Sequence, residues 1–149
     1  MGKVRVLLDT NIIVSGLAFA KGNEHKILRL VEDQHIRLVL PKSVLLEAKR
    51  VLAERFPGFE VLLDLFLSRI EFENVPVQSI LSTSRTYEKE VSDPKDATLY
   101  AAVIIARPDY AVTGDKALRL DLNRFPEIAS KTKACSSKEL LDELGEKKS

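Results

Sequence analysis

The chain is poor in the residues on which several classes of protein depend. Its 149 residues include one cysteine, two histidines, one methionine and no tryptophan. A single cysteine, Cys135, excludes an internal disulfide and a cysteine-rich zinc site, and it fits a reducing compartment. His25 and His35 lack the spacing of a zinc-binding pair. The sequence therefore excludes a disulfide-stapled secreted domain and a structural zinc centre.

Long apolar runs and an excess of one charge are also missing. The apolar stretch at the start of the chain is too short for a signal peptide or a membrane span. Lysine and arginine number 23 against 22 for aspartate and glutamate, so the formal net charge is only +1. We therefore expect a soluble, cytoplasmic protein with no membrane partner, in which any contact with nucleic acid is local.

The apolar content is sufficient for one hydrophobic core. Hydrophobic residues make up 45% of the chain, and no repeat, linker or low-complexity tract divides it. A chain of this length holds one well-filled core but not two ordinary domains. We predict a single domain over residues 1–149, with a frayed end at residues 145–149.

Short apolar runs alternate with segments of helical periodicity. Strands are predicted at residues 4–8, 37–40, 110–113 and 131–135, and residues 72–75 fit a short strand or a loop. Helices are predicted at residues 12–19, 27–31, 44–52, 61–67, 97–106, 116–122 and 138–144, and the polar segment 78–95 fits a surface helix or a loop. This alternation predicts the α/β class, as a three-layer α/β/α sandwich with a mainly parallel central sheet.

Four separate segments each bring one acid to the same end of this predicted sheet. Asp9 and Asp115 follow strands, while Glu47 and Asp96 lie in the first turns of helices. Ligands of such sheets bind beyond the carboxyl ends of the strands. Two carboxylates about 4 Å apart repel by roughly 4 kcal/mol at an effective dielectric constant near 20, so a cluster of four requires protons or cations. Mg²⁺ or Mn²⁺ fits oxygen ligands, and such a site hydrolyses phosphodiesters with a metal-activated water.

The ordered motifs resemble the PIN (PilT N-terminus-like) domain family over nearly the whole chain. They are Leu-Leu-Asp9-Thr10-Asn11-Ile-Ile-Val-Ser15, Glu47 in a helix, Asp93-Pro-Lys-Asp96 and Thr113-Gly-Asp115-Lys116. The resemblance implies a PIN-like fold and a nuclease that depends on Mg²⁺ or Mn²⁺. It commonly implies an endoribonuclease that cuts single-stranded RNA, often the toxin of a VapC-type toxin–antitoxin pair. A partner antitoxin and a homodimer are expected on the same grounds.

The resemblance also implies roles for individual residues. The catalytic and metal-binding quartet would be Asp9, Glu47, Asp96 and Asp115. The polar side chains that orient this quartet would be Thr10, Asn11, Ser15 and Thr113. The chain departs from many relatives at Ala117, where they carry a further acid, and this weakens the expectation of a second metal ion.

Several of these residues also have a purely structural interpretation. Asp9 and Asp115 each precede a predicted helix and could act only as caps, and Glu47 could be an ordinary solvated glutamate. Asp93 is assigned to structure, because Asp93 at the N-cap, Pro94 at the first helical position and Asp96 at the third make a favourable helix start. Basic side chains near the motifs are candidates for phosphate contacts. Lys116 is the foremost of them, and Arg119 is another.

Other functions compete with RNA cleavage. A regulatory or catalytically weak PIN domain would bind RNA or a protein partner without cutting. A phosphatase of the haloacid dehalogenase kind would need a second acid where Asn11 stands. A flap-type DNA nuclease would need insertions that this length does not hold.

Overall fold

The computed structural model describes residues 2–89, 91, 93 and 96–148, without the side chains of residues 146–148. The strands are β1 (Val4–Leu8), β2 (Ile36–Pro41), β3 (Phe72–Val75), β4 (Tyr110–Val112) and β5 (Lys133–Cys135). The helices are α1 (Thr10–Ala18), α2 (Asn23–Glu32), α3 (Lys42–Arg55), α4 (Glu60–Ser68), α5 (Val77–Tyr87), α6 (Ala97–Ala106), α7 (Lys116–Arg124), α8 (Pro126–Ala129) and α9 (Ser137–Lys148).

The strands form one five-stranded parallel sheet in the order β3-β2-β1-β4-β5. The central strand is β1, where Val6 lies opposite Leu38 of β2 on one side and Tyr110 of β4 on the other. Its last three residues are fully buried, as expected for a parallel strand that is covered on both faces. All five strands therefore end at the same edge, which we call the carboxyl edge, and Asp9 directly follows β1 there.

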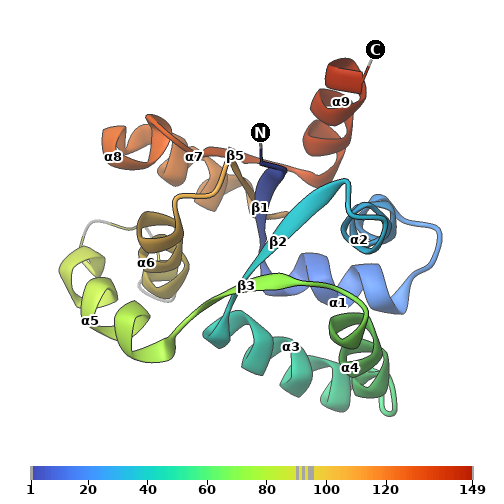
Figure 1. Cartoon of the computed structure of the whole chain (residues 1–149). Coiled ribbons are helices and arrows are strands. Elements are labelled where there is room, and N and C mark those ends of the chain that lie inside the picture. Colours follow the sequence, from blue (N-terminus) through green and yellow to red (C-terminus); the bar gives the residue numbers. More distant parts are fainter. Residues whose placement is uncertain (1, 90, 92, 94–95, 149) are drawn as a thin grey trace.

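The helices form two layers, one on each face of the sheet (Figure 1). On one side α1 packs against α2 and α3, α3 against α4, and α2 against α9. On the other side α5 packs against α6, and α8 packs against both α6 and α7. This arrangement confirms the predicted three-layer α/β/α sandwich with a parallel central sheet.

Helix α6 crosses the sheet and is anchored at the edge opposite the carboxyl edge. It is apolar around most of its circumference, and its bounds are those predicted from the sequence. The Arg5 guanidinium donates to the carbonyls of Ala106 (2.8 Å) and Arg107 (2.9 Å) at the end of α6, and to both carboxylate oxygens of Glu73 (2.7 and 2.8 Å). Because α6 ends at this edge, its first turn, next to Asp96, lies at the carboxyl edge.

The observed elements differ from the predicted ones where apolar periodicity is weak. Residues 72–75 form a strand. Residues 78–87 of the polar segment lie in α5, which buries only Ile80 and Ser84. The short helix α8 was not predicted, and α9 continues to Lys148, beyond the point where the sequence predicts a frayed end. No helix within the described ranges is both long and apolar enough to cross a membrane.

Candidate active site

A cleft of about 260 Å³ lies at the carboxyl edge and contains all four predicted acids. These acids come from four segments that are distant in the sequence: the end of β1, helix α3, the start of α6 and the start of α7. The residues that line the cleft are Asp9, Thr10, Asn11, Ser43, Val44, Glu47, Asp96, Thr98, Leu99, Asp115 and Leu118.

Asp9 connects the central strand to the first helix and uses both carboxylate oxygens in doing so. Its backbone N–H donates to the carbonyl of Val112 at 3.0 Å, which fixes it beside β4. Its Oδ1 accepts a bond from the Thr10 N–H at 2.7 Å at the N-cap of α1, and its Oδ2 accepts from the Thr113 hydroxyl at 2.8 Å. Asp9 therefore caps a helix and lines the cleft at once, so the two interpretations of this residue are compatible.

Thr113 joins two of the acids through a single buried hydroxyl. Its side chain is 1% exposed, and its Oγ1 donates to Asp9 and accepts from the backbone N–H of Asp115 at 3.2 Å. The Oδ1 of Asp115 in turn accepts from the N–H of Leu118 at 3.1 Å and caps α7. The turn after β4 thus fixes the position of Asp115 relative to Asp9.

Thr10 has the corresponding role for the third acid. This threonine is buried, and its Oγ1 donates to Oε2 of Glu47 at 3.2 Å. Glu47 itself is exposed on α3, beside the buried Ala48. Two of the predicted orienting residues, Thr10 and Thr113, therefore contact the acids directly.

Asp96 lies at the N-cap of α6, whereas the sequence predicts it at the third helical position. Its backbone N–H donates to the Asp93 carbonyl at 2.9 Å. Its side chain makes no capping hydrogen bond and lines the cleft instead. Pro94 and Lys95 lie outside the described residues, so the predicted capping role of Asp93 stays a prediction.

The charges in the cleft repel one another. Burial raises the pKa of Asp9, the hydrogen bonds from Thr113 and Thr10 oppose this rise, and the charges of Glu47 and Asp115 add to it. The pKa of Asp96 is raised to about 6, mainly by burial and then by the charges of Asp93, Asp115 and Asp9. A bound cation would relieve this repulsion.

The donor set of the cleft fits a hard divalent cation. Its charged ligands are all carboxylates, which Mg²⁺ and Mn²⁺ favour. Within the described part of the chain, no three aspartate, glutamate, histidine or cysteine side chains form a ready metal-binding group. Mg²⁺ usually takes only one or two protein carboxylates and keeps several waters. A pair of acids from this cleft therefore provides enough protein ligands for one ion.

The other predicted residues lie beside the cleft rather than in its centre. Asn11 is exposed and lines both the cleft and a neighbouring pocket of about 430 Å³. Ser15, one helical turn later, lines only that neighbouring pocket. Lys116 is exposed at the start of α7 and lines neither of them, whereas Arg119 lines the neighbouring pocket.

Sequence reasoning missed three polar residues of this region. Ser43 and Thr98 line the cleft, and Asp121 is a buried acid, 5% exposed, that pairs with Arg124 at 2.9 Å and contributes to the raised pKa of Asp96. Ser43 was detectable, because it precedes Glu47 by four residues and so shares its helical face. Asp121 gave no comparable signal, since its burial depends on how α7 packs.

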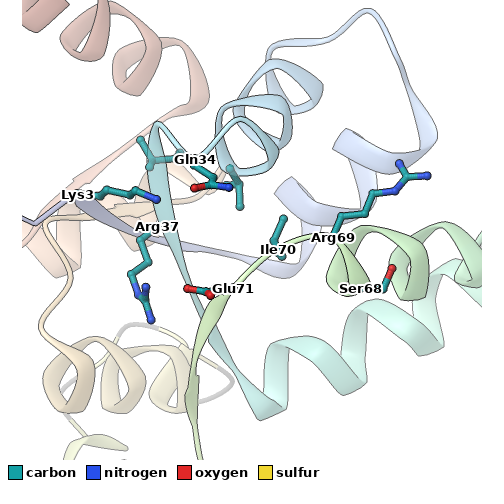
Figure 2. A pocket seen from close by; sticks show the side chains of 9 residues that line it. Lys3, Gln34, Arg37, Ser68, Arg69, Ile70 and Glu71 are labelled. Atoms are coloured by element: carbon teal, nitrogen blue, oxygen red, sulfur yellow. The ribbon is translucent and has the colours of Figure 1, made fainter.

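Another pocket, of about 340 Å³, opens at the opposite edge of the sheet (Figure 2). It lies between the end of α2, the start of β2 and the segment before β3. Its charged lining residues are Lys3, Arg37, Arg69 and Glu71. In Figure 2 Arg69 points away from the other basic side chains, and Arg37 pairs with Glu73 at 3.1 Å. It holds a single acid, so it does not share the chemistry of the carboxyl-edge cleft.

Comparison with solved structures finds the same fold in toxin–antitoxin complexes. VapBC2 from Rickettsia felis bound to a promoter DNA fragment aligns with a TM-score of 0.61 and 18% identity, over 89% of this chain and 98% of that one. A toxin–antitoxin complex from Klebsiella pneumoniae aligns with a TM-score of 0.60 and 17% identity, over 89% and 97% of the two chains. DNA-bound VapBC from Salmonella typhimurium aligns with a TM-score of 0.61 and 16% identity, over 90% and 98%.

Comparisons of the sequence identify the family of the chain. No curated protein matches the chain significantly. Residues 5–117 match the sequence profile of the PIN domain, a segment that begins in β1 and ends just after Asp115 and Lys116. This segment covers most of the chain and includes all four acids of the cleft, and the chain therefore belongs to the PIN domain family.

Proposed function

We propose that this protein is a divalent-metal-dependent nuclease that cuts single-stranded RNA within the strand. The observation that carries the proposal is the convergence of Asp9, Glu47, Asp96 and Asp115 on one cleft, with a pKa of Asp96 that is raised mainly by burial and further by its acidic neighbours. Membership of the PIN domain family supports nuclease activity in general.

The residues of the cleft have distinct roles in this proposal. Acids from the set Asp9, Glu47, Asp96 and Asp115 would hold Mg²⁺ or Mn²⁺ in pairs, and the bound ion would acidify a water molecule and offset the charge that develops on the phosphate. Thr113 and Thr10 hold Asp9 and Glu47 in fixed orientations through hydrogen bonds of 2.8 and 3.2 Å. Asn11 stands exposed at the mouth of the cleft, where it is available to the sugar–phosphate backbone.

The direct test is cleavage of a labelled single-stranded RNA with Mn²⁺ or Mg²⁺, with and without excess EDTA. We expect cleavage that EDTA abolishes and that Asp9→Asn lowers by orders of magnitude. Asp33→Asn is the matched control, because Asp33 is an exposed aspartate at the end of α2, away from the cleft. Undiminished cleavage in excess EDTA would refute the proposed mechanism, and metal-independent RNA binding without any cleavage would favour a regulatory PIN domain.

We also propose that the protein is the toxin of a toxin–antitoxin pair and that its antitoxin covers an apolar surface of α1, α3 and α4. Phe19, Val61 and Leu65 on this surface are 56%, 55% and 45% exposed. The ring of Phe56 lies 5.7 Å from that of Phe19 and 5.9 Å from that of Phe59. Exposed apolar patches of this kind mark interaction sites. The toxin–antitoxin complexes of similar fold support this choice of partner.

The test is co-expression with the product of the adjacent reading frame, followed by co-purification. We expect a complex that Leu65→Glu disrupts without changing the melting temperature of the isolated chain, because Leu65 is half exposed. The expected homodimer is the other candidate occupant of this surface. Light scattering of the isolated chain distinguishes the two, since a dimer mass that Leu65→Glu converts to a monomer mass would assign the surface to a second copy.

A further inference from the structure

A polar pocket adjoins the acidic cleft at the carboxyl edge of the sheet. It has a volume of about 430 Å³, within the range of roughly 300–1,000 Å³ that small-molecule sites occupy. The exposed side chain of Asn11 lines both cavities, so the two adjoin each other at this residue. A strand of nucleic acid that is bound in the cleft and continues past Asn11 meets this pocket next.

One wall of the pocket combines two cations. Arg119 of α7 and Lys138 of α9 both line it. Nη1 of Arg119 donates to the Thr113 carbonyl at 2.8 Å, which ties this guanidinium to the residue that holds Asp9. Its Nε lies 4.0 Å from the Glu139 carboxylate, a distance at the limit of an ion pair. The guanidinium therefore keeps donors for a ligand while its position is fixed.

The same wall includes the start of helix α9. Ser136 and Glu139 form a reciprocal cap, in which the Ser136 N–H donates to Oε1 of Glu139 at 2.9 Å and the Glu139 N–H donates to Oγ of Ser136 at 3.2 Å. This cap leaves the N–H groups of the first two helical residues, Ser137 and Lys138, without an intrahelical acceptor. Ser137 lines the pocket, is 6% exposed, and its hydroxyl has no partner among the described residues.

The pocket is also lined by polar residues of α1 and α2. These are Ser15, Asn23 and Glu24, of which Glu24 is an acid. A carboxylate here disfavours a phosphate but accepts hydrogen bonds from hydroxyl and amino groups. The lining thus combines cations with hydrogen-bonding groups, as a nucleotide with its phosphate, sugar and base requires.

We propose that this pocket binds the nucleotide next to the cleaved phosphodiester, with the phosphate of that nucleotide against Arg119 and Lys138 and its sugar or base against Asn23 and Glu24. This inference rests on the proposed nuclease function for the identity of the ligand. Arg119 and Lys138 are binding residues in it, and they contact a phosphate that is not the one that reacts.

The test measures RNA binding apart from cleavage, by fluorescence anisotropy of a labelled single-stranded RNA in EDTA over a range of salt concentrations. Lys138→Ala is expected to weaken binding several-fold and to reduce the slope of log Kd against log salt by about 0.7, the value for one lost phosphate contact in a single strand. Arg119→Ala should weaken binding further, and Arg119→Lys should restore part of the loss. Lys3→Ala is the matched control, since Lys3 is an exposed lysine at the opposite edge.

Cleavage in Mn²⁺ provides the second readout. Lys138→Ala is expected to raise KM and leave kcat unchanged, because the flanking phosphate is bound equally before and during the reaction. If Lys138→Ala and Lys3→Ala show the same affinity and salt slope as the unaltered protein, the inference is overturned even when the protein cuts RNA. If the protein binds RNA with the predicted Lys138 dependence but does not cut it, the pocket is a nucleotide-binding site as inferred, and the proposed nuclease function fails.

Discussion

Replacement of Thr113 by valine isolates the hydrogen bond that holds Asp9. Valine has nearly the same shape, so Thr113→Val leaves no cavity but removes the donor to Asp9 and the acceptor for the Asp115 N–H. A hydrogen bond to a charged group contributes about 1.5–3 kcal/mol, and an exposed partner lowers this figure because water replaces the lost bond. Since Asp115 is exposed and Asp9 is partly so, we expect a loss of about 1–2 kcal/mol of unfolding free energy at neutral pH.

The loss of unfolding free energy in Thr113→Val should depend on pH, because the hydrogen bond acts on the charge of Asp9. The Thr113 hydrogen bond lowers the pKa of Asp9 against the opposing effect of burial, so it stabilises the ionised form. Its contribution is present above the pKa of Asp9 and disappears as the pH falls through that value. Urea unfolding in EDTA at pH 7.5 and pH 4 measures the difference between the variant and the unaltered protein, which should shrink at the lower pH.

A second buried threonine serves as the control. Thr132 is 2% exposed, and its hydroxyl donates to the uncharged carbonyl of Pro108 at 2.6 Å, at the edge opposite the cleft. Thr132→Val should cost about 0.5–1.5 kcal/mol at both pH values and leave RNA cleavage unchanged. If Thr113→Val shows the same pH-independent loss as Thr132→Val, the hydrogen bond does not favour ionised Asp9 and the electrostatic reasoning about the cleft is wrong.

Three further substitutions test the acids themselves. Asp9→Asn should melt at the same or a higher temperature than the unaltered protein in EDTA, because burial and repulsion raise the pKa of Asp9 overall; a clearly lower melting temperature would make Asp9 chiefly structural. The pKa of Asp96 is about 6 in the folded protein against 3.8 ordinarily, so the folded state binds more protons between these values and metal-free stability should fall as the pH rises from about 4 to about 6. Asp96→Asn should flatten this dependence in urea unfolding, and an unchanged slope would contradict the raised value. Asp93→Ala should cost about 0.5–2 kcal/mol through loss of a cap, with Mn²⁺-dependent cleavage retained; an inactive but fully stable variant would move Asp93 into the site.

The parts of the fold that the sequence predicts well are those whose residues are mostly buried. Residues 4–8 and 97–106 are almost entirely apolar, so their burial follows from composition, and each apolar run has the bounds of the observed element. The acid after residues 4–8 was then placed correctly at the carboxyl edge. Helix α5 was ambiguous because only Ile80 and Ser84 are buried on it, which is too sparse for a clear helical period.

The start of α6 illustrates a different difficulty. A proline one position after an aspartate is a strong signal for a helix start, and it predicts that the helix begins at Pro94. In the structure α6 begins at Ala97, so Asp96 stands at the N-cap and not at the third helical position. The side chain of Asp96 makes no capping hydrogen bond and lines the cleft.

The positions of Asn11 and Ser15 follow from helical geometry. These two residues are four apart, so they share one face of α1, and both line the neighbouring pocket. Thr10 lies on another face, and it contacts Glu47 instead. The polar residues of one motif are therefore divided between the acidic cleft and the pocket next to it.

Helical geometry also determines which cation of α7 lies beside the site. Lys116 adjoins Asp115 in the sequence, but it is exposed and lines neither cavity. Arg119 is one turn later, and its backbone N–H donates to the Asp115 carbonyl at 3.0 Å. Side chains of a helix lean towards its N-terminus, so the Arg119 guanidinium reaches back over that turn to the Thr113 carbonyl. The residue one turn after the acid, rather than the residue next to it, therefore brings the positive charge to the wall of the pocket.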